Sequence, residues 1–185
     1  MKLVFNERKA AQAAAYLLKT HGGELNYMAL IKLLYLADRD ALLKVGYPIT
    51  GGHLVSLPHG PVLSQVLDLI NMPSQVETPW FEYISSPERY HVSLKVAEPE
   101  TDELSEFEME TLRKVHERYG SMDQWQLRDL THTLPEWDDP HGSSLPIEPE
   151  RILREGGKPP EWIERVVQDA EEAWFYDNVS KATQS

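Results

Sequence analysis

The sequence predicts a mainly α-helical domain with small β-hairpins. Three observations favour this fold class: apolar residues recur at helical spacing in several long segments, capping residues and glycines bound those segments, and only short stretches alternate as a strand would. The chain has 185 residues, 41% of them apolar, which is enough for one hydrophobic core without disulfide or metal support. We therefore expect a single domain over 1–185, with about seven helices and a frayed tail over 181–185.

Two long helices are predicted near the start of the chain. Asn6 can cap a helix over 7–20, and Asn26 can cap a second helix over 27–45 that ends at Gly46. Apolar residues cover most of the circumference of the second helix. This pattern indicates a central helix that is packed on several sides.

A short hairpin and a third helix are expected next. The hairpin would cover 48–57 and turn at Gly51 and Gly52, and Pro61 suits the first position of a helix over 61–71. Two helices, a hairpin and a third helix make this N-terminal portion winged-helix-like. The third helix of a winged helix enters the DNA major groove, but this one contains no Lys or Arg, which disfavours sequence-specific DNA binding.

The second half is predicted to add one more hairpin and four helices. Strands over 80–84 and 90–96 would pair with each other, because the second strand alternates apolar and polar residues. The helices are expected over 105–119, 121–133, 149–156 and 161–178, with a proline-rich, irregular loop over 134–149.

The starts of two of these helices carry capping signals. Ser105 with Glu108, and Ser121 with Gln124, have the spacing of a capping box. The last helix is amphipathic, and its apolar residues should form an inner face. These residues are Ile163, Val166, Val167, Ala170, Trp174 and Phe175.

The net charge of −12 is concentrated in the second half of the chain. Residues 1–97 carry a net charge of +1 and residues 98–185 a net charge of −13. The segment 98–110 alone has seven carboxylates and no basic residue. It is either a solvated surface or a face that steers a basic partner. Binding to a phosphate backbone is disfavoured in both cases, because such binding depends on Lys and Arg.

The composition gives no sign of an enzyme, a metal site or a membrane protein. There is no cysteine, no apolar signal segment and no apolar stretch long enough to span a bilayer, so a cytoplasmic location is expected. The seven histidines lack the spacing of a zinc site, and neither a nucleophile elbow nor a glycine-rich phosphate loop occurs. We expect no cofactor, no metal and no catalytic residues.

Two segments nevertheless stand out. In the first, Gly60 would allow a sharp approach to the third helix and Pro61 would set its first turn, so His59 is either a hydrogen-bonded turn residue or a group held beside a helix N-terminus. In the second, a helix ends at His132 and a loop brings in Trp137. That tryptophan either fills the core or is a recognition aromatic.

These segments belong to four motifs that resemble a known family. Residues 33–38 (Leu-Leu-Tyr-Leu-Ala-Asp), 47–51 (Tyr-Pro-Ile-Thr-Gly), 59–64 (His-Gly-Pro-Val-Leu-Ser) and 130–132 (Leu-Thr-His), the last followed by Pro135 and Trp137, occur in this order. Together they resemble the Panacea domain of SocA-like antitoxins, over about 5–140. Family members often have proline directly before the tryptophan, whereas Glu136 intervenes here. The segment 145–180 lacks the motifs and is expected to form C-terminal helices of the same domain.

The resemblance implies an antitoxin that neutralises a toxin encoded beside it, often near prophage genes. Some members act as adaptors that deliver the toxin to the ATP-dependent protease ClpXP, and others neutralise by direct binding. We expect a partner-binding surface near the motif residues. They are His59, Gly60, Pro61, Tyr35, Asp38, His132 and Trp137.

Two other functions stay open at this point. The first is a DNA-binding transcriptional autoregulator that uses the winged-helix-like portion. A cationic stripe would favour it, formed by Lys2, Arg8, Lys9, Lys19, Lys32 and Lys44. The second is a hydrolase built on His59 and His132. The sequence also leaves open whether the chain forms a homodimer.

Overall fold

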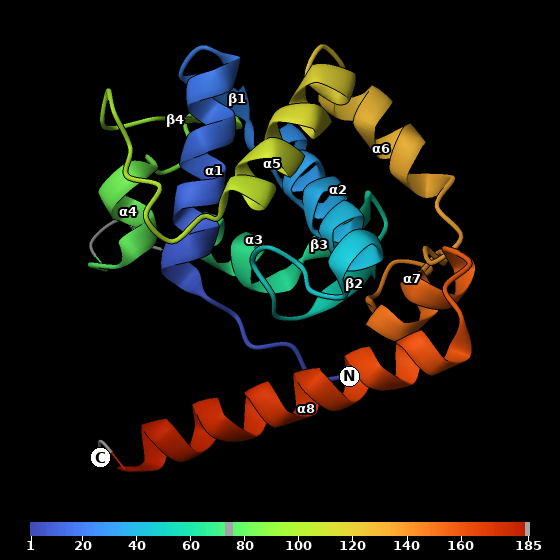
Figure 1. The fold of residues 1–185 in the computed structure, drawn as a ribbon. Coiled ribbons are helices and arrows are strands. Elements are labelled where there is room, and N and C mark those ends of the chain that lie inside the picture. Colours follow the sequence, from blue (N-terminus) through green and yellow to red (C-terminus); the bar gives the residue numbers. More distant parts are fainter. Residues whose placement is uncertain (73–75, 184–185) are drawn as a thin grey trace.

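The computed structural model describes residues 1–72 and 76–183, with side chains to residue 180, and this part of the chain is mainly α-helical, as predicted (Figure 1). The helices are α1 (Glu7–His21), α2 (Tyr27–Val45), α3 (Ser64–Asn71), α4 (Pro79–Tyr83), α5 (Glu106–Tyr119), α6 (Gln124–His132), α7 (Pro149–Glu155) and α8 (Pro160–Thr183). The strands are β1 (Glu24–Asn26), β2 (Leu54–Leu57), β3 (Gly60–Leu63), β4 (His91–Ser93) and β5 (Leu145–Ile147). They form two small antiparallel sheets, with strand orders β1-β4 and β3-β2-β5.

Helix α2 is the centre of the fold, as its apolar circumference predicted. It packs against α1, α5, α6, α7 and both sheets, and Figure 1 shows it enclosed by these elements. The predicted caps are present: the Asn26 side chain accepts a hydrogen bond from the Met28 backbone N–H, and Gly46 ends the helix in a left-handed conformation. Two residues that carry a charge at neutral pH in water, Lys32 and Asp38, are buried on this helix.

The first hairpin lies further along the chain than the sequence predicted. It consists of β2 and β3 and turns at Pro58 and His59, whereas Gly51 and Gly52 precede β2. Pro61 therefore lies in a strand and does not begin a helix. It fits there because β3 is an edge strand, where the missing N–H breaks no ladder.

Helix α3 consequently begins at Ser64 and not at Pro61. Val62 and Leu63 are buried, and they pair with Val55 and Leu54 of β2. These two apolar residues therefore belong to the sheet and not to the apolar face of a helix. The predicted helix was wrong over its first three residues. As a result, His59 lies at a hairpin turn and not beside a helix N-terminus.

The second predicted hairpin was also wrong. The segment expected to be a strand over 80–84 is mostly the short helix α4, with Pro79 at its first position. Trp80 and Tyr83 are both buried, and their spacing of three suits a helix face. The expected strand over 90–96 shortens to β4, which pairs with β1, and only a single bridge joins Ile84 to Leu94.

The later helices differ from expectation mainly at their ends. The capping box of Ser105 and Glu108 opens α5 as predicted, but α6 is capped by Asp123 with Gln126, and not by Ser121. The loop expected over 134–149 contributes β5 to the larger sheet. The side chain of Phe175 is 59% exposed, so it does not belong to the inner face of α8.

Helix α8 lies along one side of the body, and its C-terminal end extends beyond the other elements (Figure 1). Its buried residues Ile163, Val166 and Ala170 hold the first half against the core, with Val166 close to Gly46. Over 1–72 and 76–183, no helix combines the length and the apolar character that crossing a bilayer requires.

Candidate partner-binding surface

Two separated segments fix the β2–β3 turn, which we call the hairpin tip (residues 57–61). From α2, the Lys32 amino group donates a hydrogen bond to the Pro61 carbonyl oxygen over 2.7 Å. From the loop after α6, the Trp137 indole N–H donates to the Leu57 carbonyl oxygen over 3.2 Å. The hairpin tip is therefore held at both of its ends by side chains distant in sequence.

Gly60 allows the hairpin tip to lie against the end of α6. Its φ is +93°, and a Cβ at this position would lie 2.8 Å from the Thr131 hydroxyl oxygen and 2.9 Å from the Lys32 amino nitrogen. Both the backbone conformation and the close packing favour glycine. The sharp approach expected at Gly60 is thus directed at α2 and α6.

His132 and Trp137 form a stacked pair beneath the hairpin tip. Their ring centroids lie 4.0 Å apart, and their planes differ by 8°. The Nε2 atom of His132 is buried and has no hydrogen-bond partner among the residues that the structure describes. Burial, followed by the charge of Lys32, lowers the pKa of His132, so the imidazole is neutral near pH 7. The stacked pair supports the hairpin tip as a rigid aromatic layer.

Glu136, the residue that intervenes before Trp137, is anchored to α2. Its buried carboxylate accepts hydrogen bonds from the Tyr35 hydroxyl over 3.0 Å and from the Arg39 Nε over 2.6 Å. Burial and then Glu136 raise the pKa of Tyr35 well above its ordinary value. This departure from the usual family pattern therefore fixes the loop that carries Trp137.

Asp38 supports a different turn. Its carboxylate accepts hydrogen bonds from the backbone N–H groups of Ile49 and Thr50 and from the Thr50 hydroxyl. Burial raises its pKa to about 7 although these hydrogen bonds oppose the shift. The adjacent charged residues Asp38 and Arg39 therefore have different surroundings: Asp38 is buried in the core, while Arg39 pairs with Glu136.

Lys32 is fully buried, and its hydrogen bond to Pro61 is made without a carboxylate partner among the described residues. Burial lowers its pKa to about 7. The cost of burying this amine is reduced when the amine is neutral. Lys32 thus connects α2 to the hairpin tip as a hydrogen-bond donor rather than as a salt-bridge partner.

The exposed side of this arrangement carries His59, Trp125 and Arg128, which we call the tip surface. Trp125, on α6, is 47% exposed. Its ring lies edge-on to His59, with centroids 6.0 Å apart, and the Arg128 guanidinium carbon lies 5.1 Å from its centroid. An exposed tryptophan three residues before an arginine on one helix face is a combination typical of recognition surfaces.

Six of the seven predicted site residues gather around the hairpin tip, whereas Asp38 supports the turn at Ile49 and Thr50, and most of the seven lie below the surface. Tyr35, Asp38, Gly60 and Pro61 are buried, His132 and Trp137 are partly buried, and His59 is exposed. Sequence reasoning missed Trp125 and Arg128. The signal that could have found them is an aromatic residue on the polar face of α6, three positions from a cation.

The acidic segment 98–110 is used largely within the chain. It crosses α1 as a strap (Figure 1), and Glu98 pairs with Lys19, Asp102 with Gln12 and Glu108 with Lys9. Within the described ranges Glu106 is its one carboxylate without an intramolecular partner. Four of the seven carboxylates pair with cations, and Asp102 and Glu103 bond to uncharged amides, so less charge is free to steer a basic partner than the sequence alone suggests.

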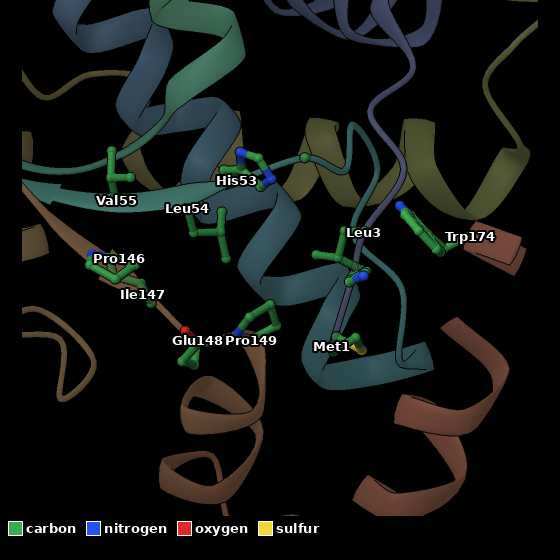
Figure 2. Close-up of a pocket in the computed structure, with 12 residues that line it drawn as sticks. Met1, Leu3, His53, Leu54, Val55, Pro146, Ile147, Glu148, Pro149 and Trp174 are labelled. Atoms are coloured by element: carbon green, nitrogen blue, oxygen red, sulfur yellow. The ribbon is translucent and has the colours of Figure 1, made fainter. Parts of the chain in front are cut away.

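A hollow of about 540 Å³ lies apart from this cluster (Figure 2). Figure 2 shows it between β2 and β5 on one side and the N-terminal segment with Trp174 on the other. Its lining is mostly apolar, and the Lys2 amino nitrogen lies 3.9 Å from the Trp174 ring centroid. It contains none of the motif residues, so we do not assign the partner-binding surface to it.

Comparison with known proteins agrees with the motif residues. Residues 30–138 match the family described as antitoxin SocA-like, Panacea domain. The matched segment begins in the first turn of α2, includes the rest of that helix, the hairpin tip, α6 and Trp137, and ends before α7 and α8. No curated protein and no solved structure shows a significant match to the chain.

Proposed function

Because the chain belongs to the SocA-like antitoxin family with a Panacea domain, we propose that it neutralises a cognate toxin protein by direct binding at the tip surface. The proposed action is occupation of the toxin by a folded protein, without a catalytic step, in the cytoplasm. The observation that carries the proposal is the exposed Trp125 beside His59, on a foundation of buried and mutually bonded motif residues.

Rigidity of this foundation supports a binding role. Association costs less when the contacting groups are already ordered, because fewer rotamers are lost on binding. The hairpin tip accepts hydrogen bonds from the side chains of Lys32 and Trp137. Glu136 fixes the loop that carries Trp137 through its bond to Arg39. Tryptophan and arginine dominate the energetics of many interfaces, so Trp125 and Arg128 would supply most of the affinity.

The charge of the chain supports a basic toxin. A net charge of −12 creates a negative field that would accelerate encounter with a cationic protein. Since four of the seven carboxylates of 98–110 are paired with cations, this field would come from the whole molecule. High salt should then slow association while leaving the Trp125 contact largely unaffected.

Delivery of the toxin to ClpXP is the second mode that the family suggests. An adaptor would use the tip surface for the toxin and would need a separate surface for the protease. Toxin half-life, measured with and without the protease, distinguishes delivery from blocking.

A DNA-binding autoregulator has less support. Of the cations in the expected stripe, Lys9 and Lys19 pair with carboxylates of the acidic strap and Lys32 is buried. A nucleic acid would have to break the ion pairs of Lys9 and Lys19 before its phosphates could bind these cations and release counterions. The third helix, α3, contributes no Lys or Arg.

The test is co-expression. Each open reading frame beside the gene is expressed in a bacterial host, alone and together with this protein, and growth is measured. We expect one neighbour to stop growth and the wild-type chain to restore it, while a folded Trp125→Ala variant restores it poorly. If no neighbour is toxic, or if Trp125→Ala protects as well as wild type, the proposed role or its surface is wrong.

A further inference from the structure

A cleft between α2, α5 and α6 has a charge opposite to that of the protein as a whole. It has a volume of about 300 Å³, at the lower end of ligand-pocket sizes. Four cationic residues line it, and Asp40 is the one acidic residue in the lining. The cations are Arg39, Lys44, Lys114 and Arg118. In a chain with a net charge of −12, such a concentration of basic residues requires explanation.

The floor of the cleft is apolar. Leu36 and Val115 are buried there, and Leu130, Leu134 and Tyr119 are partly exposed to it. Apolar groups that remain open to solvent inside a concave site gain free energy when a ligand covers them. The cleft therefore combines a hydrophobic floor with a cationic rim.

Two of the four cations are not fully neutralised by the chain itself. Arg39 pairs with Glu136, and Lys44 pairs with Asp40. Lys114 shares Glu110 with Arg113, which makes two hydrogen bonds to that carboxylate.

Hydrogen bonds from Arg113, and then Lys114, lower the pKa of Glu110 to about 2. The guanidinium carbon of Arg118 lies 5.1 Å from the Tyr119 ring centroid. Arg118 has no carboxylate partner in the described part of the chain. Lys114 and Arg118 are thus the cations most available to a ligand.

We propose that this cleft is a second protein-binding site, which takes an acidic peptide segment with an apolar residue between its carboxylates. The carboxylates would pair with Lys114 and Arg118, where charge-assisted hydrogen bonds are strong. The apolar residue would cover Leu130 and Leu134. A nucleic acid fits less well, because its phosphates would leave the apolar floor uncovered.

The cleft and the tip surface lie on different faces of α6. Leu130 of α6, and Leu134 just after the helix, line the cleft, whereas Trp125 and Arg128 of α6 belong to the tip surface. Five residues along an α-helix correspond to a rotation of roughly 140°, which separates Trp125 from Leu130. A basic toxin at the tip surface and an acidic segment in the cleft could therefore be bound at the same time. This inference goes beyond toxin neutralisation, since it concerns a second partner.

The experiment uses a random peptide library displayed on phage and selected on the full chain. A parallel selection uses the double variant Lys114→Glu/Arg118→Glu, and the consensus peptide is synthesised for fluorescence anisotropy. Arg165→Glu, a charge reversal at an exposed position of α8 that does not line the cleft, is the matched control. Arg118→Gln is a milder variant in case the double variant folds poorly.

We expect a consensus of Asp or Glu beside Leu, Ile or Phe, and an affinity reduced about tenfold in Arg118→Gln. Arg165→Glu and Trp125→Ala should bind the peptide like wild type. A basic or uncharged consensus, or equal enrichment on the double variant, overturns the proposal. So does equal binding of a peptide whose apolar residues are replaced by serine, or displacement by inorganic phosphate alone.

Discussion

The buried amino group of Lys32 donates its hydrogen bond to the backbone carbonyl of Pro61, 2.7 Å away. This contact joins the central helix α2 to the hairpin tip without an opposing carboxylate in the described residues. An amine in such surroundings favours its neutral form, and burial lowers the pKa of Lys32 to about 7. The stability of the fold and the order of the hairpin tip should therefore depend on pH.

We predict that stability increases with pH above neutrality because of Lys32. An unfolded lysine has a pKa near 10.5, so between about 7 and 10.5 the unfolded chain binds more protons than the folded chain. The stability that depends on neutral Lys32 is fully present above a pH of about 10.5, and it is lost as the pH falls through 7. Urea titrations should show the wild type gaining about 1 kcal/mol per pH unit relative to Lys32→Met between pH 7 and 10. Parallel profiles for the two proteins would contradict this assignment.

Asp38 should produce the opposite slope at lower pH. Its pKa rises from 3.8 in the unfolded chain to about 7 on folding, so between these values the folded chain binds more protons. Stability from this group is complete below the unfolded pKa and is lost as pH rises toward 7. Thermal unfolding between pH 4 and 7 should therefore show a loss in wild type that Asp38→Asn lacks. If both proteins show the same pH slope, Asp38 is ionised in the fold.

Gly60→Ala should damage the hairpin tip. The new methyl group would meet the Thr131 hydroxyl and the Lys32 amine, and alanine is strained at a φ of +93°. We expect a loss of about 2 to 4 kcal/mol in the free energy of unfolding, measured by urea denaturation. Gly142→Ala is the control, because Gly142 has a similar φ of +86° but open space around it. Its loss should be only about 1 kcal/mol, so equal losses would mean that packing at Gly60 is unimportant.

Glu136→Gln should destabilise the fold by about 2 kcal/mol, because it leaves the partly buried Arg39 without its carboxylate. Glutamine retains the shape of the side chain and can still accept from the Tyr35 hydroxyl, so the loss reports mainly on the charge. Glu106→Gln serves as an exposed control and should change stability by less than about 0.5 kcal/mol. A stability equal to wild type for Glu136→Gln would show that the ion pair contributes nothing.

Trp125 and Trp137 should separate binding from folding. Trp125→Ala removes an exposed ring, so it should leave the melting temperature almost unchanged and weaken toxin binding by about 2 kcal/mol. Trp137→Ala removes the ring stacked on His132 and its bond to Leu57, so it should reduce both stability and binding. Calorimetric binding and thermal melts of both variants provide the measurement. The reverse pattern would place the contact at Trp137 and not at Trp125.

Local signals predicted the long helices well. Asn6, Asn26 and Gly46 act within one or two turns of the chain, so their effects can be predicted without knowing the rest of the fold. The hairpins could not be placed in this way. Pro61 is compatible with the start of a helix or with an edge strand, and only its pairing with Ser56 in β2 decides between them.

The candidate site was predicted as a set of motifs but not as a surface. The order of the four motifs indicated the family and singled out His59, His132 and Trp137, whereas the structure brings the last two into a stacked pair beside the hairpin tip. Nothing local distinguished the buried Tyr35 from the exposed Trp125, because burial depends on which helix packs against which. The pairing of Glu136 with Arg39 spans 97 residues and has no local sequence signal.

The sequence by itself determined the helix boundaries near the caps, the central position of α2 and the family of the chain. These follow from apolar periodicity, capping chemistry and motif order, which are properties of neighbouring residues. The tertiary structure decided which motif residues support the hairpin tip and which are exposed, and it used the acidic segment 98–110 as a strap over α1. The physical reason is that hydrogen bonds, ion pairs and burial join residues distant in sequence, so their partners are set only when the whole chain packs.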